Sequence, residues 1–190
     1  MKKLTLLVAL ASLSIGSAVA ADGLNFGKLD YTFRDYDGTG SNRNGAEITL
    51  GRQIVPGFVV DGRAELLVTN GSENTANRLE AGASILAPLT SDITGFVRGA
   101  VGERFVSGDR YSYYSVEPGV SVALNKEWGV NTSYRFRDSF SSNTVGAESH
   151  LFRVGTSYAL TENTSVTASI GRVWGDEQYN VVNVGYGFKF

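Results

Sequence analysis

His150 is the only histidine of the 190-residue chain and the side chain that best suits general acid–base catalysis near neutral pH. Glu148 shares its parity along an extended strand and could orient the imidazole, and Asp138 lies across the same polar stretch. Ser149 is adjacent to His150, so on a strand it faces the other way and is badly placed as a nucleophile. No second acidic cluster accompanies these residues. Catalysis by these residues is therefore the most remote of the hypotheses, and we expect no enzyme.

The other candidate chemistry is electrostatic, because many arginines alternate with apolar residues along extended segments. Side chains of an extended segment alternate between two faces, and we expect the face that carries the charges to point inward. The predicted pore-lining residues on this inner face are Arg34, Arg63, Arg78, Arg98, Arg104, Arg135, Arg137, Arg153, Asp61, Glu65, Glu80 and Glu117. Lys28, Lys189, Asp30 and Glu47 share this parity, so ten cations face six carboxylates, an excess of four positive charges. Fixed positive charge favours anions in a pore. A buried charge without a partner is costly, so the surplus arginines require water or an anion.

These side chains must be positioned by strands, because apolar residues recur with a period of two throughout the chain. The expected strands are residues 26–35, 45–54, 58–69, 77–86, 93–105, 112–124, 127–137, 150–160, 164–174 and 181–190. In the last strand Val182, Val184, Tyr186, Phe188 and Phe190 lie on one face, while small or polar residues lie on the other. Such an apolar edge strand would promote aggregation in a soluble protein, whereas in a closed membrane barrel it pairs on both sides.

The connections between these strands alternate in length. Residues 55–57, 87–92, 125–126 and 161–163 are short, whereas residues 36–44, 70–76, 106–111, 138–149 and 175–178 are mostly longer and polar. Short periplasmic turns and long extracellular loops characterise transmembrane barrels, whose strands need about 9–11 residues. The sequence thus predicts an all-β fold, a transmembrane antiparallel up-and-down barrel of about ten strands. Eight or twelve strands are the alternatives.

Aromatic residues gather near both ends of the outward faces, where membrane barrels carry aromatic girdles. The predicted membrane-interface residues are Trp128, Trp174, Tyr186, Phe188 and Phe190. Arg52 and Arg172 depart from the pattern because they fall on the outward parity near strand ends. Either their side chains extend to the interface, which we favour, or a β-bulge shifts the register.

The first 20 residues have the features of a cleavable signal peptide. Lys2 and Lys3 precede a short apolar run, and Ala18-Val19-Ala20 forms a cleavage site, which leaves residues 21–190 as one barrel domain. The apolar run is too short for a spanning helix. The chain contains no cysteine, which excludes disulfides, thiolate metal sites and thiol nucleophiles. We expect no cofactor, no metal and no nucleic-acid partner.

The strand pattern, together with segments such as Tyr134-Arg135-Phe136-Arg137, resembles the small monomeric porins for acidic oligosaccharides, whose lumens are lined by arginine. This resemblance is diffuse and lies mainly in residues 113–190. It implies a narrow passive pore for small anionic or polar solutes. The chain also resembles OmpA- and OmpX-type barrels, which implies the alternative of a non-conducting structural or adhesion barrel. The enzymatic alternative, a hydrolase at the rim of the barrel, depends on a likeness to outer-membrane proteases and lipid A deacylases.

The same resemblance implies a location and partners. A final strand that ends on Phe190 is similar to the assembly signal of bacterial outer-membrane barrels. The expected location is the outer membrane of a Gram-negative bacterium, as a monomer. The expected partners are outer-membrane lipid and lipopolysaccharide, the barrel-assembly machinery through the C-terminal strand, and small solutes.

Overall fold

A computed structural model describes residues 25–37, 42–70, 75–106, 109–141 and 148–190. The predicted signal peptide, residues 1–20, lies outside these ranges. The strands are β1 (Asn25–Tyr36), β2 (Asn42–Val55), β3 (Phe58–Thr69), β4 (Thr75–Pro88), β5 (Ile93–Val106), β6 (Asp109–Ala123), β7 (Trp128–Ser139), β8 (Ser149–Ala159), β9 (Thr164–Gly175) and β10 (Tyr179–Lys189). The described part of the chain contains no helix long and apolar enough to cross a membrane.

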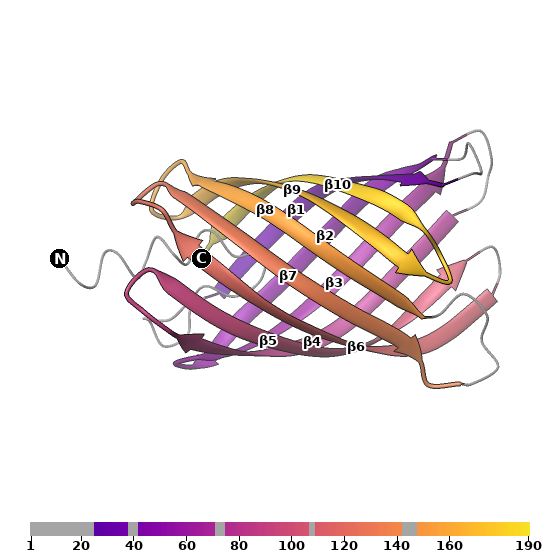
Figure 1. Cartoon of the computed structure of the whole chain (residues 1–190), viewed down its shortest axis with the longest axis horizontal. Coiled ribbons are helices and arrows are strands. Elements are labelled where there is room, and N and C mark those ends of the chain that lie inside the picture. The colour runs from indigo at the N-terminus through magenta and orange to yellow at the C-terminus, as the bar shows by residue number, and fades with distance from the viewer. Residues whose placement is uncertain (1–24, 38–41, 71–74, 107–108, 142–147) are drawn as a thin grey trace.

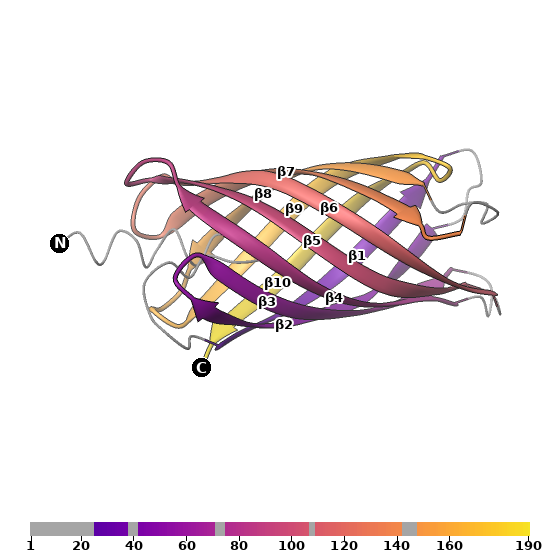
Figure 2. The same cartoon turned by 90° about the horizontal axis from the view of Figure 1, so that it is seen from below.

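The ten strands close into one barrel in which sequence neighbours pair and β1 pairs with β10 (Figures 1 and 2). The closing seam is antiparallel and regular from Phe26–Lys189 to Tyr36–Tyr179. At its end the backbones of Asn25 and Phe190 exchange hydrogen bonds of 3.3 and 3.0 Å. The apolar final strand therefore pairs on both sides. The prediction of an antiparallel up-and-down barrel is confirmed with ten strands, and the alternatives of eight and twelve are wrong.

The barrel buries mainly polar side chains and exposes mainly apolar ones, which is the reverse of a soluble protein. Among the described residues, 25 buried side chains are polar or charged and 11 are hydrophobic. Large apolar side chains lie on the outside, with exposed fractions of 61% for Leu66, 65% for Ile85 and 65% for Ile170. Soluble proteins bury such side chains. An apolar exterior and a polar interior are typical of a transmembrane barrel, in which lipid covers the outer wall.

The contrast in connection length is weaker than the sequence predicted. At one end the connections contain five, five, two, nine and three residues, and at the other two, four, four and four. The predicted loop 106–111 is wrong, because β5 runs to Val106 and β6 begins at Asp109, in register with it. The ladder continues through polar residues because backbone hydrogen bonds do not depend on apolar side chains.

The two outward arginines lie in regular strands. Arg172 pairs in unbroken register with Phe152 on one side and Asn180 on the other. The register shift of β2 falls between Gln53 and Val55, beyond Arg52, so a bulge does not account for either arginine. The Arg172 guanidinium donates a 2.9 Å hydrogen bond to Asp37, in the loop after β1. This hydrogen bond lowers the pKa of the Asp37 carboxyl.

Candidate pore interior

The structure places the predicted pore-lining residues in the barrel interior. Arg34, Arg63, Arg78, Arg98, Arg104, Arg135, Arg137, Asp61, Glu65, Glu80 and Glu117 are buried, and Arg153 lines the central cavity. Lys28, Asp30 and Glu47 line the same cavity. Lys189 lies at the barrel end, where its Nζ is 3.3 Å from the backbone oxygen of Glu162. Strand parity thus predicted the facing of these side chains, but not their partners.

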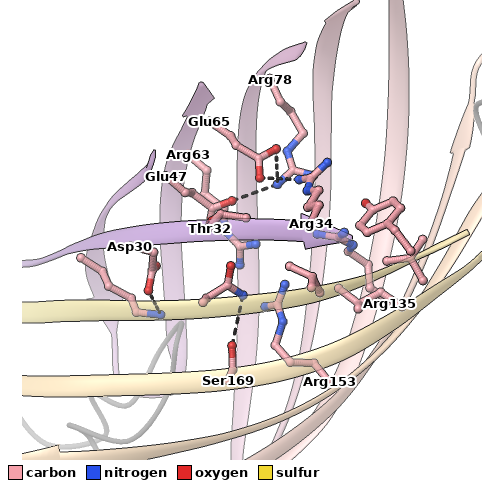
Figure 3. A pocket seen from close by; sticks show the side chains of 16 residues that line it. Asp30, Thr32, Arg34, Glu47, Arg63, Glu65, Arg78, Arg135, Arg153 and Ser169 are labelled. Atoms are coloured by element: carbon pink, nitrogen blue, oxygen red, sulfur yellow. Dashed lines mark hydrogen bonds and ion pairs between the residues drawn. The ribbon is translucent and has the colours of Figure 1, made fainter. Parts of the chain in front are cut away.

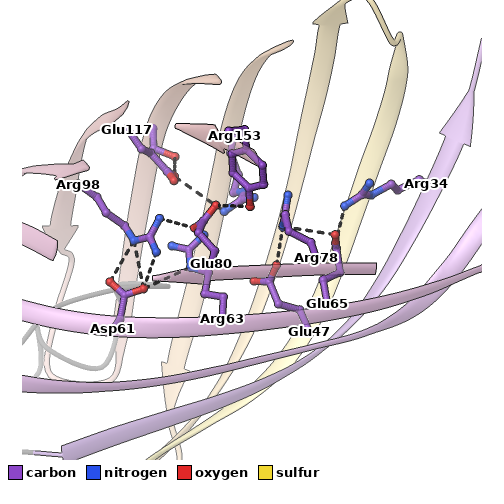
Figure 4. Close-up of polar contacts among 12 residues, drawn as sticks. Arg34, Glu47, Asp61, Arg63, Glu65, Arg78, Glu80, Arg98, Glu117 and Arg153 are labelled. Carbon is purple, nitrogen blue, oxygen red and sulfur yellow. Dashed lines mark hydrogen bonds and ion pairs between the residues drawn. The ribbon is translucent and has the colours of Figure 1, made fainter. Parts of the chain in front are cut away.

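The first ion-pair cluster joins Arg34, Glu47, Glu65 and Arg78, from β1 to β4 (Figure 4). Glu47 and Glu65 are directly opposite in the β2–β3 register, an arrangement that is unfavourable for two carboxylates. The Nη2 atom of Arg78 lies 2.9 Å from Glu47 Oε2 and 3.4 Å from Glu65 Oε2. Arg34 donates a further hydrogen bond to Glu65. The two arginines therefore compensate the facing acids.

The second ion-pair cluster joins Asp61, Arg63, Glu80 and Arg98, from β3 to β5 (Figure 4). Arg98 binds Asp61 through two nitrogens, with Nε at 3.0 Å from Oδ2 and Nη2 at 2.6 Å from Oδ1. It also donates to Glu80, which accepts a 2.9 Å hydrogen bond from the Tyr113 hydroxyl. A Cβ at Gly82 would lie 2.4 Å from Nη2 of Arg98. The glycine therefore provides the space that this guanidinium occupies.

The other side of the barrel carries cations and lacks these acids. β8, β9 and β10 contain no Asp or Glu, and the inner face of β7 carries Arg135 and Arg137. Within the described chain neither arginine forms an ion pair, and Arg137 stacks over the Tyr113 ring at 5.3 Å. Arg153 of β8 is 3.9 Å from Glu117. We call the inner faces of β7 to β10 the acid-free wall.

Small residues along the acid-free wall accommodate side chains from neighbouring strands, since a Cβ would lie 2.0 Å from Asp30 Oδ1 at Gly185 and 2.8 Å from Leu151 Cδ1 at Gly171. Ser157, Ser165, Gly155, Gly171 and Gly185 lie on its inner parity, as do Leu151, Val173 and Val181, which form an apolar cluster with Tyr179. The central cavity lies between this wall and the first ion-pair cluster (Figure 3). It offers about 20 Å³ to water-sized particles. A single water needs about 10–15 Å³ by this measure, so this cavity has room for about one water molecule.

One ion pair crosses the bore at the end with the longer loops. Arg104 of β5 donates hydrogen bonds of 2.7 and 2.8 Å to Glu177, in the loop between β9 and β10. β5 and β10 are five places apart in the ten-strand order, so they lie opposite each other. Burial raises the pKa of Glu177, but the charge and hydrogen bonds of Arg104 lower it by more, so it falls below the ordinary value of 4.5. Glu177 was not predicted as a site residue, because the alternation of side chains along a strand does not indicate the direction of a side chain in a loop.

The interior charge differs from the prediction at three residues. Lys189 lies at the barrel end, and Glu177 adds a carboxylate that parity could not assign. Arg43 of β2 lies directly opposite the inward Arg34 and hydrogen bonds to Tyr36 and Thr69, so it adds a cation. Ten interior cations then face seven carboxylates in the described chain, an excess of three. The expected excess of four is therefore too large. The three surplus cations correspond to Arg43, Arg135 and Arg137, which form no ion pair within the described chain.

His150 lies on the outward face, away from this interior. Its Nδ1 is 2.6 Å from the Tyr134 hydroxyl, and its Nε2 is 3.2 Å from Glu148 Oε1, the partner expected from parity. Its ring stacks on Trp174 at 5.7 Å. Ser149 is buried on the inner side, so the structure does not bring it to the imidazole. Asp138 accepts a hydrogen bond from the backbone of Ser139 instead.

The predicted interface aromatics all lie on the outer surface. Trp128, Trp174, Tyr186, Phe188 and Phe190 are exposed. Trp128 packs on Tyr158 at 4.9 Å at the end with the short turns, and Phe188 and Phe190 stack at 5.7 Å near the same end. Trp174 lies toward the other end, beside His150. Contact of these side chains with the membrane interfaces stays a prediction.

Comparison with known proteins gives a likeness in fold. No protein-family profile and no curated protein sequence matches this chain. An outer-membrane channel from Pseudomonas putida F1 is similar at 10% identity and a TM-score of 0.62, over 94% of this chain and 100% of that one. The β domain of the Bordetella autotransporter BrkA is similar at 11% identity and a TM-score of 0.53, over 88% of this chain and 99% of that one. The KdgM porin in complex with disordered oligogalacturonate is similar at 15% identity and a TM-score of 0.50, over 86% of this chain and 99% of that one. The chain is thus a small β-barrel of the outer-membrane type, and the predicted resemblance to porins is confirmed for the fold.

Proposed function

We propose that the protein is a narrow passive pore of the outer membrane that favours small anionic or polar solutes. The observation that carries this proposal is the acid-free wall, with its two buried arginines that lack a carboxylate partner. Positive charge fixed along one side of a bore lowers the barrier to anions. On the other side the two ion-pair clusters are compensated internally, so they add little net charge.

The path for solutes would follow the acid-free wall. The central cavity borders this wall, while arginines from the opposite strands are held in ion pairs. Eight-stranded barrels are filled by side chains and barrels of 16–18 strands enclose an aqueous channel. With ten strands and a cavity of about 20 Å³, a bore of this kind suits ions and small polar molecules rather than oligosaccharides.

A second candidate function is a sealed structural or adhesion barrel. Two contacts favour it. Arg98 forms ion pairs with both Asp61 and Glu80, and Arg104 forms an ion pair with Glu177 across the bore. In this case the interior is a plug, and the outer loops carry the function. A hydrolase at the rim has less support, because Ser149 and His150 face opposite sides of the wall.

The location and partners are part of the same proposal. The outward apolar belt would lie in outer-membrane lipid and lipopolysaccharide after removal of residues 1–20. The C-terminal strand, which pairs on both sides and ends on an exposed Phe190, would be read by the barrel-assembly machinery. We propose a monomer, because closure of the barrel leaves no sheet edge for a second copy.

Planar-bilayer recording of the refolded protein tests the proposal. The wild type should conduct, and its reversal potential in a salt gradient should indicate a preference for anions. Substitution of Arg135 and Arg153 by serine should reduce that preference, whereas Arg52→Ser, which removes a charge from the outer face, should not. A silent wild-type protein would refute the pore and favour the sealed barrel.

A further inference from the structure

Arg135 and Arg153 are cations in diagonal positions on the neighbouring strands β7 and β8, and both carry unused hydrogen-bond donors. Both line the central cavity, and Figure 3 shows them on one side, with Glu47 and Glu65 on the other. Arg135 is only 3% exposed. Its Nε and Nη1 have no acceptor, and neither does Nε of Arg153, within the described chain. Buried guanidinium groups with orphan donors are costly unless another group accepts their hydrogen bonds.

The surrounding charges do not relieve this cost. The main electrostatic neighbours of Arg135 are the cations Arg78, Arg137 and Arg153 and the carboxylate Glu117. Glu117 accepts a 2.8 Å hydrogen bond from Ser133, and its closest approach to Arg153 is 3.9 Å. The acids of the first ion-pair cluster are already bound by Arg34 and Arg78. Oε2 of Glu117 is also without a partner, but no group of the described chain accepts hydrogen bonds from Nε and Nη1 of Arg135, so an acceptor from solution would satisfy these donors.

We infer that Arg135 and Arg153 form a binding site for one small inorganic anion, such as a halide, inside the barrel. The site has orphan donors on two cations, an excess of positive charge and a cavity of matching size. About 20 Å³ accommodates a particle close to the size of water and excludes a sugar acid. This inference rests on the proposed function, in that the bound anion is a permeating one, and it narrows the solute to inorganic anions.

The site can be detected without conduction. Bromide is the probe, because crystals grown or soaked in sodium bromide report the anion by anomalous scattering. A single peak within hydrogen-bond distance of Arg135 and Arg153 is expected. In detergent, the melting temperature should be higher in bromide or chloride than in gluconate at equal ionic strength, because gluconate is too large for the cavity and a ligand that binds only the folded state stabilises it.

Two matched variants make the test specific. Arg135→Gln should abolish the difference between halide and gluconate and the bromide peak. Arg137→Gln removes an equal charge from the same buried strand face but away from the cavity lining, and it should keep both. Equal melting temperatures in all salts, with a cavity that contains water alone, would overturn the anion site even if the pore conducts. A bromide peak in a protein that does not conduct would instead overturn the pore and the permeating role of the anion.

Discussion

Neutralising Glu80 tests whether the interior ion pairs are desolvated. Glu80 accepts hydrogen bonds from Arg98 and Tyr113, and its Oε1 lies 3.9 Å from Arg63. Its side chain is 0% exposed in the barrel, as is that of Asp61. Glu80→Gln keeps the shape and one acceptor oxygen but removes the charge, so the second ion-pair cluster becomes positive.

The expected loss of stability follows from burial. Breaking a buried ion pair by removing one partner costs about 3–5 kcal/mol. Asp61 still binds Arg98 through two nitrogens, so the effect should fall near the lower limit, about 3 kcal/mol. Since about 1.4 kcal/mol is a tenfold change, the folding equilibrium constant should fall by roughly 100-fold.

Glu103→Gln is the matched control, because Glu103 pairs at 2.6 Å with Arg110, whose side chain is 64% exposed. A surface pair contributes about 0–1 kcal/mol after solvent screening. Urea unfolding of both variants in lipid vesicles, followed by the fluorescence of Trp128 and Trp174, gives the two free energies. At 1 M salt the Glu103 effect should vanish while the Glu80 effect persists, because screening acts on exposed charges. Equal, small and salt-sensitive effects would show that water solvates the interior pairs, and the reasoning from burial would fail.

Three further changes have defined outcomes. Phe190→Asp should reduce the outer-membrane level of the protein, because it places a charge at the apolar end of β10, whereas Phe140→Asp, at an exposed position beyond β7, should not. Gly82→Ala should lower the melting temperature, by about 1–3 kcal/mol in stability, because its Cβ would overlap Arg98, whereas Gly99→Ala, with nothing within 4 Å, should not. The hydrogen bonds of Glu177 to its arginine should persist above about pH 4.5 and be lost as the pH falls through the lower pKa of the folded state. Protease sensitivity of the loop should then rise at low pH in the wild type, and Glu177→Gln should be sensitive at every pH.

Strand parity was sufficient to predict which residues face inward, because side chains of a β-strand alternate and lipid demands one apolar face. Arg98 and Asp61 were placed inside on this ground alone, and the structure agrees. Their contact could not be predicted in the same way. Arg98 is on β5 and Asp61 on β3, so their guanidinium and carboxylate meet across an intervening strand. Such contacts depend on strand tilt and side-chain reach, which periodicity does not encode.

The ends of the barrel were the hardest part to predict. Arg104 and Tyr111 hydrogen bond at 2.9 Å in the segment where strands extend beyond their apolar pattern, and polarity alone suggested a loop there. Glu177 lies in a true loop, but it reaches across the bore to a strand 73 residues away in sequence. Long-range closure of this kind requires the strand order and the barrel diameter, and a single sequence provides neither directly.

The two halves of the interior have separable roles. The ion-pair clusters draw their acids from β2 to β4 and compensate their own arginines, so they should govern stability. The acid-free wall contributes uncompensated cations and small side chains, so it should govern solute preference. A change at Glu80 leaves buried arginines without their carboxylate partner but does not alter that wall. A change at Arg135 removes a cation that forms no ion pair with any carboxylate in the described chain. Stability and selectivity should therefore respond to different sets of substitutions, because the compensated charges and the free ones lie on different strands.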